Sequence, residues 1–162
     1  MRIIASVLSA LFFGLLAASL VFAHCQIPCG IYDDELRVKM LEEHITTIEK
    51  SMNEITRMSQ EGDKNYNQIV RWVTNKDEHA DEFSETVTYY FMTQRVKLVD
   101  DKTSDAYKTY LRQLTLLHEM LVYAMKAKQT TDLTNVQKLR SLVADFRIAY
   151  FGPSGTGQEQ KH

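Results

Sequence analysis

The chain has 162 residues, of which 44% are hydrophobic and 25% charged, with only six glycines and two prolines. This composition fits one soluble domain with a real core and differs from that of a disordered chain. The formal net charge of −2 includes no broad basic excess, which argues against a nucleic-acid partner or an anionic membrane surface. The two cysteines, Cys25 and Cys29, are too few for a disulfide scaffold.

Residues 1–23 have the layout of a secretory signal peptide. Arg2 gives a positive start, an apolar run covers residues 3–20, and Val21 and Ala23 suit the −3 and −1 positions of a cleavage site. Cleavage after Ala23 would export the protein to a periplasm, the extracellular space or an organelle lumen. No stable membrane association is expected once the segment is removed.

Two other interpretations of this segment are weaker. A retained membrane anchor is possible by length, because the run nearly spans a bilayer, but no basic cluster follows it. A lipoprotein acylated at Cys25 is disfavoured because His24 stands where that processing requires a small residue. Cleavage after Ala23 would make His24 the first residue, with a free α-amine.

The predicted mature N-terminus, residues 24–32, concentrates metal-binding groups. His24 offers its α-amine and its imidazole, and Cys25 and Cys29 offer two thiolates. Two small chelate rings can form when one metal ion binds the α-amine of His24 together with the peptide nitrogen and the thiol of Cys25. Such planar binding by mixed nitrogen and sulfur donors favours Ni(II) or Cu(II) over Zn(II). A Cys25–Cys29 disulfide in a non-enzymatic exported bundle is one alternative. A copper protein that uses the amine and imidazole of His24 is another.

The order of these residues resembles the nickel hook of nickel superoxide dismutases, His-Cys-x-x-Pro-Cys-Gly-x-Tyr at the mature N-terminus. All six specified positions occur within nine residues, with Pro28, Gly30 and Tyr32 in place. The resemblance implies that His24, Cys25 and Cys29 bind one nickel ion per subunit.

The same resemblance implies the activity and the assembly. Superoxide would be disproportionated to dioxygen and hydrogen peroxide while nickel cycles between Ni(II) and Ni(III). Tyr32 would limit access and order water or superoxide near the metal. The family also assembles as a homohexamer. Its usual Glu–Arg pair that braces the hook falls near Met40 and His79 here, so that brace is absent or rebuilt. A hydrogen bond from His79 to the hook is one alternative, but His79 is expected to be an ordinary surface histidine.

Residues 33–151 are predicted to form an up-down four-helix bundle, which gives an all-α fold class with the metal-binding hook at its N-terminus. Helices are expected over residues 34–59 and 65–96, then from Thr103 or Ser104, and finally from Thr131–Asp132. The expected apolar stripes are Leu41, Ile45, Ile48, Met52 and Ile55; Ile69, Val73, Ala80, Phe83, Val87 and Tyr90; Leu111, Leu114, His118, Leu121 and Met125; and Val136, Leu139, Val143, Phe146 and Tyr150. Residues 152–162 are predicted to be a flexible tail.

Two sets of polar side chains in the bundle are candidates for a function. His44 and His118 lie on or beside apolar stripes, and no Glu-x-x-His pairs accompany them, so they are expected to be satisfied core or rim histidines instead of a carboxylate-bridged metal site. A positive field that steers superoxide, or simply a solvated face, is expected from Arg37, Lys39, Arg95 and Lys97.

Overall fold

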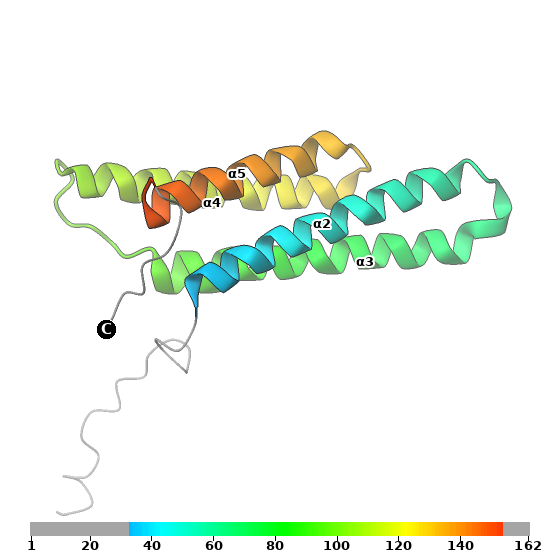
Figure 1. Ribbon diagram of the computed structural model, residues 1–162, viewed down its shortest axis with the longest axis horizontal. Helices are drawn as coiled ribbons and strands as arrows, with labels where there is room; N and C mark the ends of the chain where they lie inside the picture. Colours follow the sequence, from blue (N-terminus) through cyan, green and yellow to red (C-terminus); the bar gives the residue numbers. More distant parts are fainter. Residues whose placement is uncertain (1–32, 154–162) are drawn as a thin grey trace, which may run out of the picture. The chain divides into compact units, whose positions relative to one another are not determined.

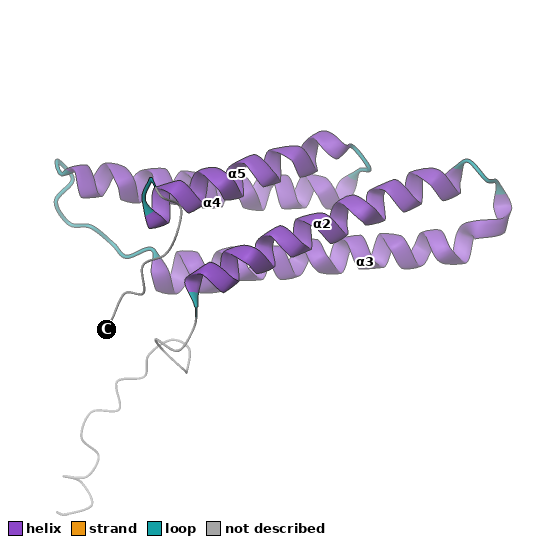
Figure 2. Ribbon diagram, in the orientation of Figure 1, coloured by secondary structure: helices purple, strands orange, loops and turns teal. Residues whose placement is uncertain are grey.

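The computed structural model describes residues 33–153, which form four long helices joined in an up-down order (Figure 1). The helices are α2 (Asp34–Ser59), α3 (Tyr66–Glu85), α4 (Asp105–Gln129) and α5 (Leu133–Phe151). A short 3-10 turn, η1 (Asp63–Asn65), precedes α3, and a π-helical segment, η2 (Thr86–Arg95), continues it. The described residues contain helices and loops but no strand (Figure 2), which confirms the predicted all-α bundle.

The helices are neighbours around the bundle in chain order. α2 packs against α3 and α5, and α4 packs against the same two helices. The hairpin of α2 and α3 extends beyond the turn that joins α4 to α5 (Figure 1). The first turn of α2, the end of η2 and the end of α5 lie at the opposite end of the bundle (Figure 1).

Local capping signals explain where the helices begin. The Ser104 hydroxyl accepts a hydrogen bond from the Tyr107 N–H at 3.2 Å, so Ser104, not Thr103, caps α4. The Asp132 carboxylate accepts from the Thr134 N–H at 2.9 Å at the start of α5. Gly152 ends α5 with a φ of 94°, a conformation that glycine adopts readily.

The predicted apolar faces are correct for α2 and α5 and only partly correct for α4, where Leu114 and Leu121 pack against the core. In α2 and α5 the stripe residues from Leu41 to Met52 and from Val136 to Phe146 are buried. In α4, Leu111, His118 and Met125 are exposed, and the core contains Leu116, Leu117, Met120, Ala124 and Ala127. Apolar residues occur on almost every side of α4, so periodicity alone does not select the buried face. Val73 of α3 is also exposed against expectation.

The π-helical segment was not predicted, although the extent of the second helix was. The Val96 N–H donates to the Phe91 carbonyl at 2.8 Å, and the Gln94 side chain donates to the Tyr89 carbonyl at 3.0 Å, five residues back in each case. The wider turn buries the adjacent residues Tyr90 and Phe91 together. A period of 3.6 residues cannot reveal such a segment, because it assumes α-helical spacing throughout.

None of the helices described is both long and apolar enough to cross a bilayer. The predicted signal peptide (1–23), the hook (24–32) and the tail beyond residue 153 lie outside the described residues.

Candidate functional site

The predicted site residues His24, Cys25, Cys29 and Tyr32 lie outside the described residues, and their roles stay predictions. The chain is described from Asp33 onward, which is the residue after Tyr32. The contacts of the first turn of α2 therefore show how firmly the residues that follow the predicted hook are held.

Asp33 fixes the start of α2 by local hydrogen bonds. Its Oδ1 accepts from the N–H of Glu35 at 2.9 Å and from the N–H of Leu36 at 3.1 Å. Asp34 and Glu35 follow as an acidic first turn, which the partial positive charge of a helix N-terminus favours. The sequence alone therefore determines that the helix begins here.

The Asp34 carboxylate then ties this turn to two other elements. The Tyr90 hydroxyl of η2 donates to Oδ1, and the Tyr150 hydroxyl of α5 donates to Oδ2 at 2.7 Å. Arg95 of η2 donates to Oδ2 from Nη2 at 2.6 Å and from Nε at 3.1 Å. Arg95 was considered for the steering of superoxide, but its guanidinium is engaged in this ion pair.

This Asp34 network is not a proton switch at neutral pH. Burial, followed by the hydrogen bond to Asp34, raises the pKa of Tyr150 to about 12. The same two causes raise the pKa of Tyr90. For Arg95, burial opposes the charge, but hydrogen bonds to Asp34 and Tyr150 outweigh it and the pKa is raised. Both phenols therefore remain donors and the guanidinium remains charged, so the network acts as a permanent anchor.

A second ion pair strengthens the same turn. Arg147 of α5 donates from Nη2 to Glu35 Oε1 at 2.5 Å, and both side chains are largely buried. Consecutive acidic residues of α2 are thus held by different partners, and the α2–α5 contact is polar at this end of the bundle.

The two positions considered for the family's brace do not pair with each other. Met40 Sδ accepts a long hydrogen bond of 3.5 Å from Arg37 Nη1 on its own helix. His79 instead contacts His44 of α2, with 2.9 Å between the two Nδ1 atoms. The expectation of an ordinary surface histidine at position 79 is therefore wrong, because its ring faces a neighbouring helix.

His44 and His79 form a cluster with Glu82 that sequence reasoning missed. Glu82 Oε2 lies 3.4 Å from His44 Nδ1 and 3.5 Å from His79 Nδ1. The order on α3 is His79-x-x-Glu82, the reverse of the Glu-x-x-His order that is typical of carboxylate-bridged metal sites. The spacing of three residues puts His79 and Glu82 on one face of a helix, and this pairing could have been found from the sequence. The contact with His44, which lies 35 residues earlier, could not.

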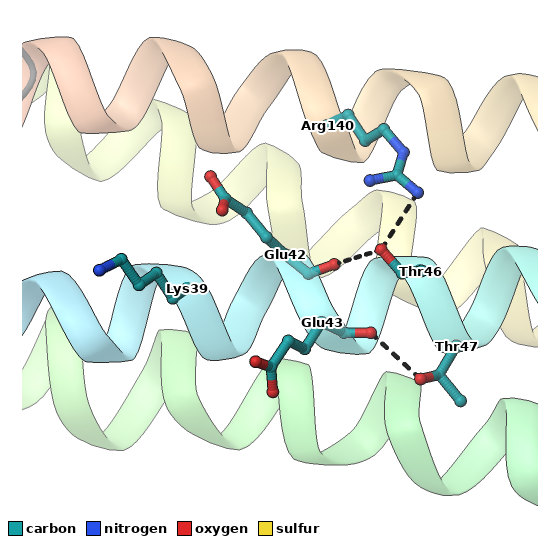
Figure 3. Close-up of a pocket in the computed structure, with 6 residues that line it drawn as sticks. All are labelled: Lys39, Glu42, Glu43, Thr46, Thr47 and Arg140. Atoms are coloured by element: carbon teal, nitrogen blue, oxygen red, sulfur yellow. Dashed lines mark hydrogen bonds between the residues drawn. The ribbon is translucent and has the colours of Figure 1, made fainter.

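A groove beside α2 contains another candidate for steering, Lys39. Its lining is Lys39, Glu42, Glu43, Thr46, Thr47 and Arg140 (Figure 3). Arg140 of α5 reaches the Thr46 hydroxyl at 3.3 Å and also pairs with Glu49 at 2.6 Å. The hydroxyls of Thr46 and Thr47 donate to backbone carbonyls of α2. Because carboxylates accompany the cations, this groove offers no selective site for a small anion.

The described residues belong to an all-α protein, a four-helix bundle in which ion pairs anchor the first turn of α2. The sequence profile of the nickel-containing superoxide dismutase family matches residues 19–153, and the chain belongs to this family. No match was found among curated proteins or among solved structures. Membership makes the protein an oxidoreductase that contains nickel and acts on superoxide, as the resemblance implied.

Proposed function

We propose that this protein disproportionates superoxide at a nickel ion bound by its own mature N-terminus, through His24, Cys25 and Cys29. The family match carries the proposal, because it covers residues 19–153 and so includes every position of the hook. The six specified hook positions point to the mature N-terminus as the place where the nickel binds. The disulfide-bonded module and the copper protein have no such support.

The donor set fits nickel. Cleavage after Ala23 would free the α-amine of His24, and the peptide nitrogen and thiolate of Cys25 would complete two chelate rings. Cys29 would add the second thiolate, and the imidazole of His24 a further nitrogen. Mixed nitrogen and thiolate donors suit nickel better than a metal that prefers oxygen ligands.

The reaction converts two superoxide ions and two protons into one dioxygen and one hydrogen peroxide. Nickel bound at the hook would supply the redox chemistry by cycling between Ni(II) and Ni(III), because thiolates and a deprotonated amide stabilise the higher state. Tyr32 would order water or superoxide next to the site and restrict access. Superoxide is a small ion, so turnover needs access to the site more than a shaped pocket.

The described bundle supports this arrangement by holding the residues that follow the hook. Cys29 is five residues before Asp34, so chain connectivity limits the distance between their Cα atoms to about 18 Å. Asp34 is fixed by Tyr90, Tyr150 and Arg95. An anchor only a few residues along the chain from the hook reduces the conformational entropy that the hook loses when it binds metal.

The remaining parts of the proposal concern processing and assembly. Residues 1–23 would direct export and be removed, which is the step that creates the ligand amine of His24. A homohexamer would follow the family. The exposed apolar residues Leu111 and Met125 of α4 are available for contacts between subunits.

The test compares the mature chain starting at His24 with the same chain extended by one glycine before His24. We expect about one nickel per mature chain, a Ni(III) electron paramagnetic resonance signal and rapid superoxide decay. The extension should abolish signal and turnover with unchanged helical circular dichroism. A Gln26→Ala chain is the matched control, because position 26 is unspecified in the hook. Full activity of the extended chain would refute the amine ligand, and copper in place of nickel would favour the copper protein.

A further inference from the structure

His44, His79 and Glu82, none of which belongs to the predicted hook sequence, converge on one point between α2 and α3. Three potential ligand atoms, one from each residue, form a triangle with edges of 2.9, 3.4 and 3.5 Å. The His79-x-x-Glu82 spacing places two of them on one face of α3. His44 supplies the third from α2, so two rigid helices set the geometry.

Hydrogen bonding alone does not account for this triangle. Each Nδ1 carries either one proton or one lone pair, and an ionised carboxylate only accepts. Two Nδ1 atoms at 2.9 Å can share a single proton, since two N–H groups at that distance would repel. One proton cannot occupy all three edges, which leaves lone pairs directed at one another. A cation at the centre satisfies all three atoms at once.

The edge lengths match those of a coordination site. Metal–nitrogen distances of about 2.0–2.1 Å and metal–oxygen distances of about 2.0–2.2 Å in tetrahedral geometry separate neighbouring ligand atoms by about 3.3 Å. The observed edges, 2.9 to 3.5 Å, lie on both sides of this value. Little rearrangement of the helices is therefore needed to admit an ion.

Burial and charge also favour a cation. The side chains of His44, His79 and Glu82 are 12%, 31% and 58% exposed, so the site is closed on the α2 side and open to solvent at the carboxylate. Burial lowers the pKa of His44, which keeps its imidazole neutral at neutral pH although Glu82 and Glu43 act in the other direction. These two carboxylates beside the neutral imidazole of His44 leave a negative local charge.

We propose that His44, His79 and Glu82 bind a divalent transition-metal ion of the zinc type, with water completing the coordination. Two imidazoles and one carboxylate with an open position are a donor set that zinc accepts. The ion would link α2 to α3 about midway along their contact and would be additional to the nickel of the proposed function. It would also raise the total metal content above one ion per chain.

The experiment uses the full mature chain with Cys25→Ser and Cys29→Ser, which removes the thiolates of the hook. Zn²⁺ is titrated against a chromophoric chelator, and Co²⁺ is used as a spectroscopic probe of tetrahedral geometry. We expect one Zn²⁺ per chain and an intense visible Co²⁺ band. Adding His79→Gln should weaken Zn²⁺ binding by at least about 100-fold, since loss of a ligand costs more than the 10- to 100-fold of an outer partner.

His118→Gln in the same background is the matched control, because His118 is an exposed histidine on α4. It should leave Zn²⁺ affinity and the Co²⁺ spectrum unchanged. Circular dichroism establishes that each variant is folded, and His44→Gln provides a second ligand deletion. Absence of Zn²⁺ binding in the folded double-serine chain would overturn the proposal, as would equal affinity in the His79→Gln and His118→Gln chains. Neither result depends on superoxide turnover or on nickel.

Discussion

Replacing Asp34 with asparagine tests whether the anchor behind the hook stabilises the bundle. The substitution keeps the shape of the side chain but removes the charge that Arg95 pairs with and that the hydroxyls of Tyr90 and Tyr150 contact. Removal of one partner from a buried ion pair costs about 3–5 kcal/mol. The side chains of Asp34 and Arg95 retain 15% and 19% exposure, and the asparagine oxygen still accepts a hydrogen bond. We therefore expect a loss of about 2–4 kcal/mol in the free energy of unfolding.

The assay is urea unfolding of the mature chain, followed by circular dichroism at a fixed protein concentration, because assembly would make stability depend on concentration. Asp105→Asn is the control, since Asp105 is 94% exposed in its ion pair with Lys108 and should contribute at most about 0.5 kcal/mol. Asp34→Asn with Arg95→Met should cost less than the sum of the single substitutions, because no charge is left unpaired. A loss for Asp34→Asn no larger than that for Asp105→Asn would refute the reasoning.

Three further predictions concern pH, a buried lysine and metal removal. Burial raises the pKa of Tyr150 from 10.0 to about 12, so above pH 10 the native state holds a proton that the unfolded state releases. The free energy of unfolding should therefore fall as the pH rises above 10. Urea titrations of the wild type and Tyr150→Phe at pH 8 to 11 check whether this dependence of the unfolding free energy on pH requires Tyr150. Lys76 is 3% exposed and donates hydrogen bonds to the carbonyls of Ala127, at 2.9 Å, and Lys128. Lys76→Met should therefore lower the free energy of unfolding by about 1–3 kcal/mol and speed amide hydrogen exchange at the end of α4. Unchanged exchange at the end of α4 would contradict this prediction. Removal of nickel by a chelator should abolish superoxide turnover without loss of the helical circular dichroism signal. The reason is that the described core from Val38 to Phe146 is formed by helix packing. A loss of helicity in parallel with the loss of nickel would contradict this prediction.

How well the sequence predicted the buried face differed between the helices. For α2 the stripe from Leu41 to Met52 was sufficient, because polar residues occupy its other faces. For α4 it was not, because leucine and methionine also occur on the side that the monomer exposes, including Leu111 and Met125. Burial there depends on which neighbours cover the helix, and periodicity contains no information on neighbours.

Of the two candidate metal sites, one was predicted from the sequence and the other was not. The hook was predicted from nine consecutive residues, since chelation by a chain terminus depends on order along the chain. The cluster of His44, His79 and Glu82 was not, because its metal-binding capacity arises only when two helices pack at one register.

The sequence by itself determined the number of helices, the start of each to within a residue or two (Asp33–Asp34, Thr103 or Ser104, and Thr131–Asp132), and the family to which the chain belongs. These features rest on hydrogen bonds and motifs within a few residues. Only the tertiary structure decided that Asp34 meets Tyr90, Arg95 and Tyr150, which follow it by 56, 61 and 116 residues. Such contacts depend on the rotation of each helix about its axis and on its offset along its neighbours. Both are set by packing of the whole core, so no local pattern records them.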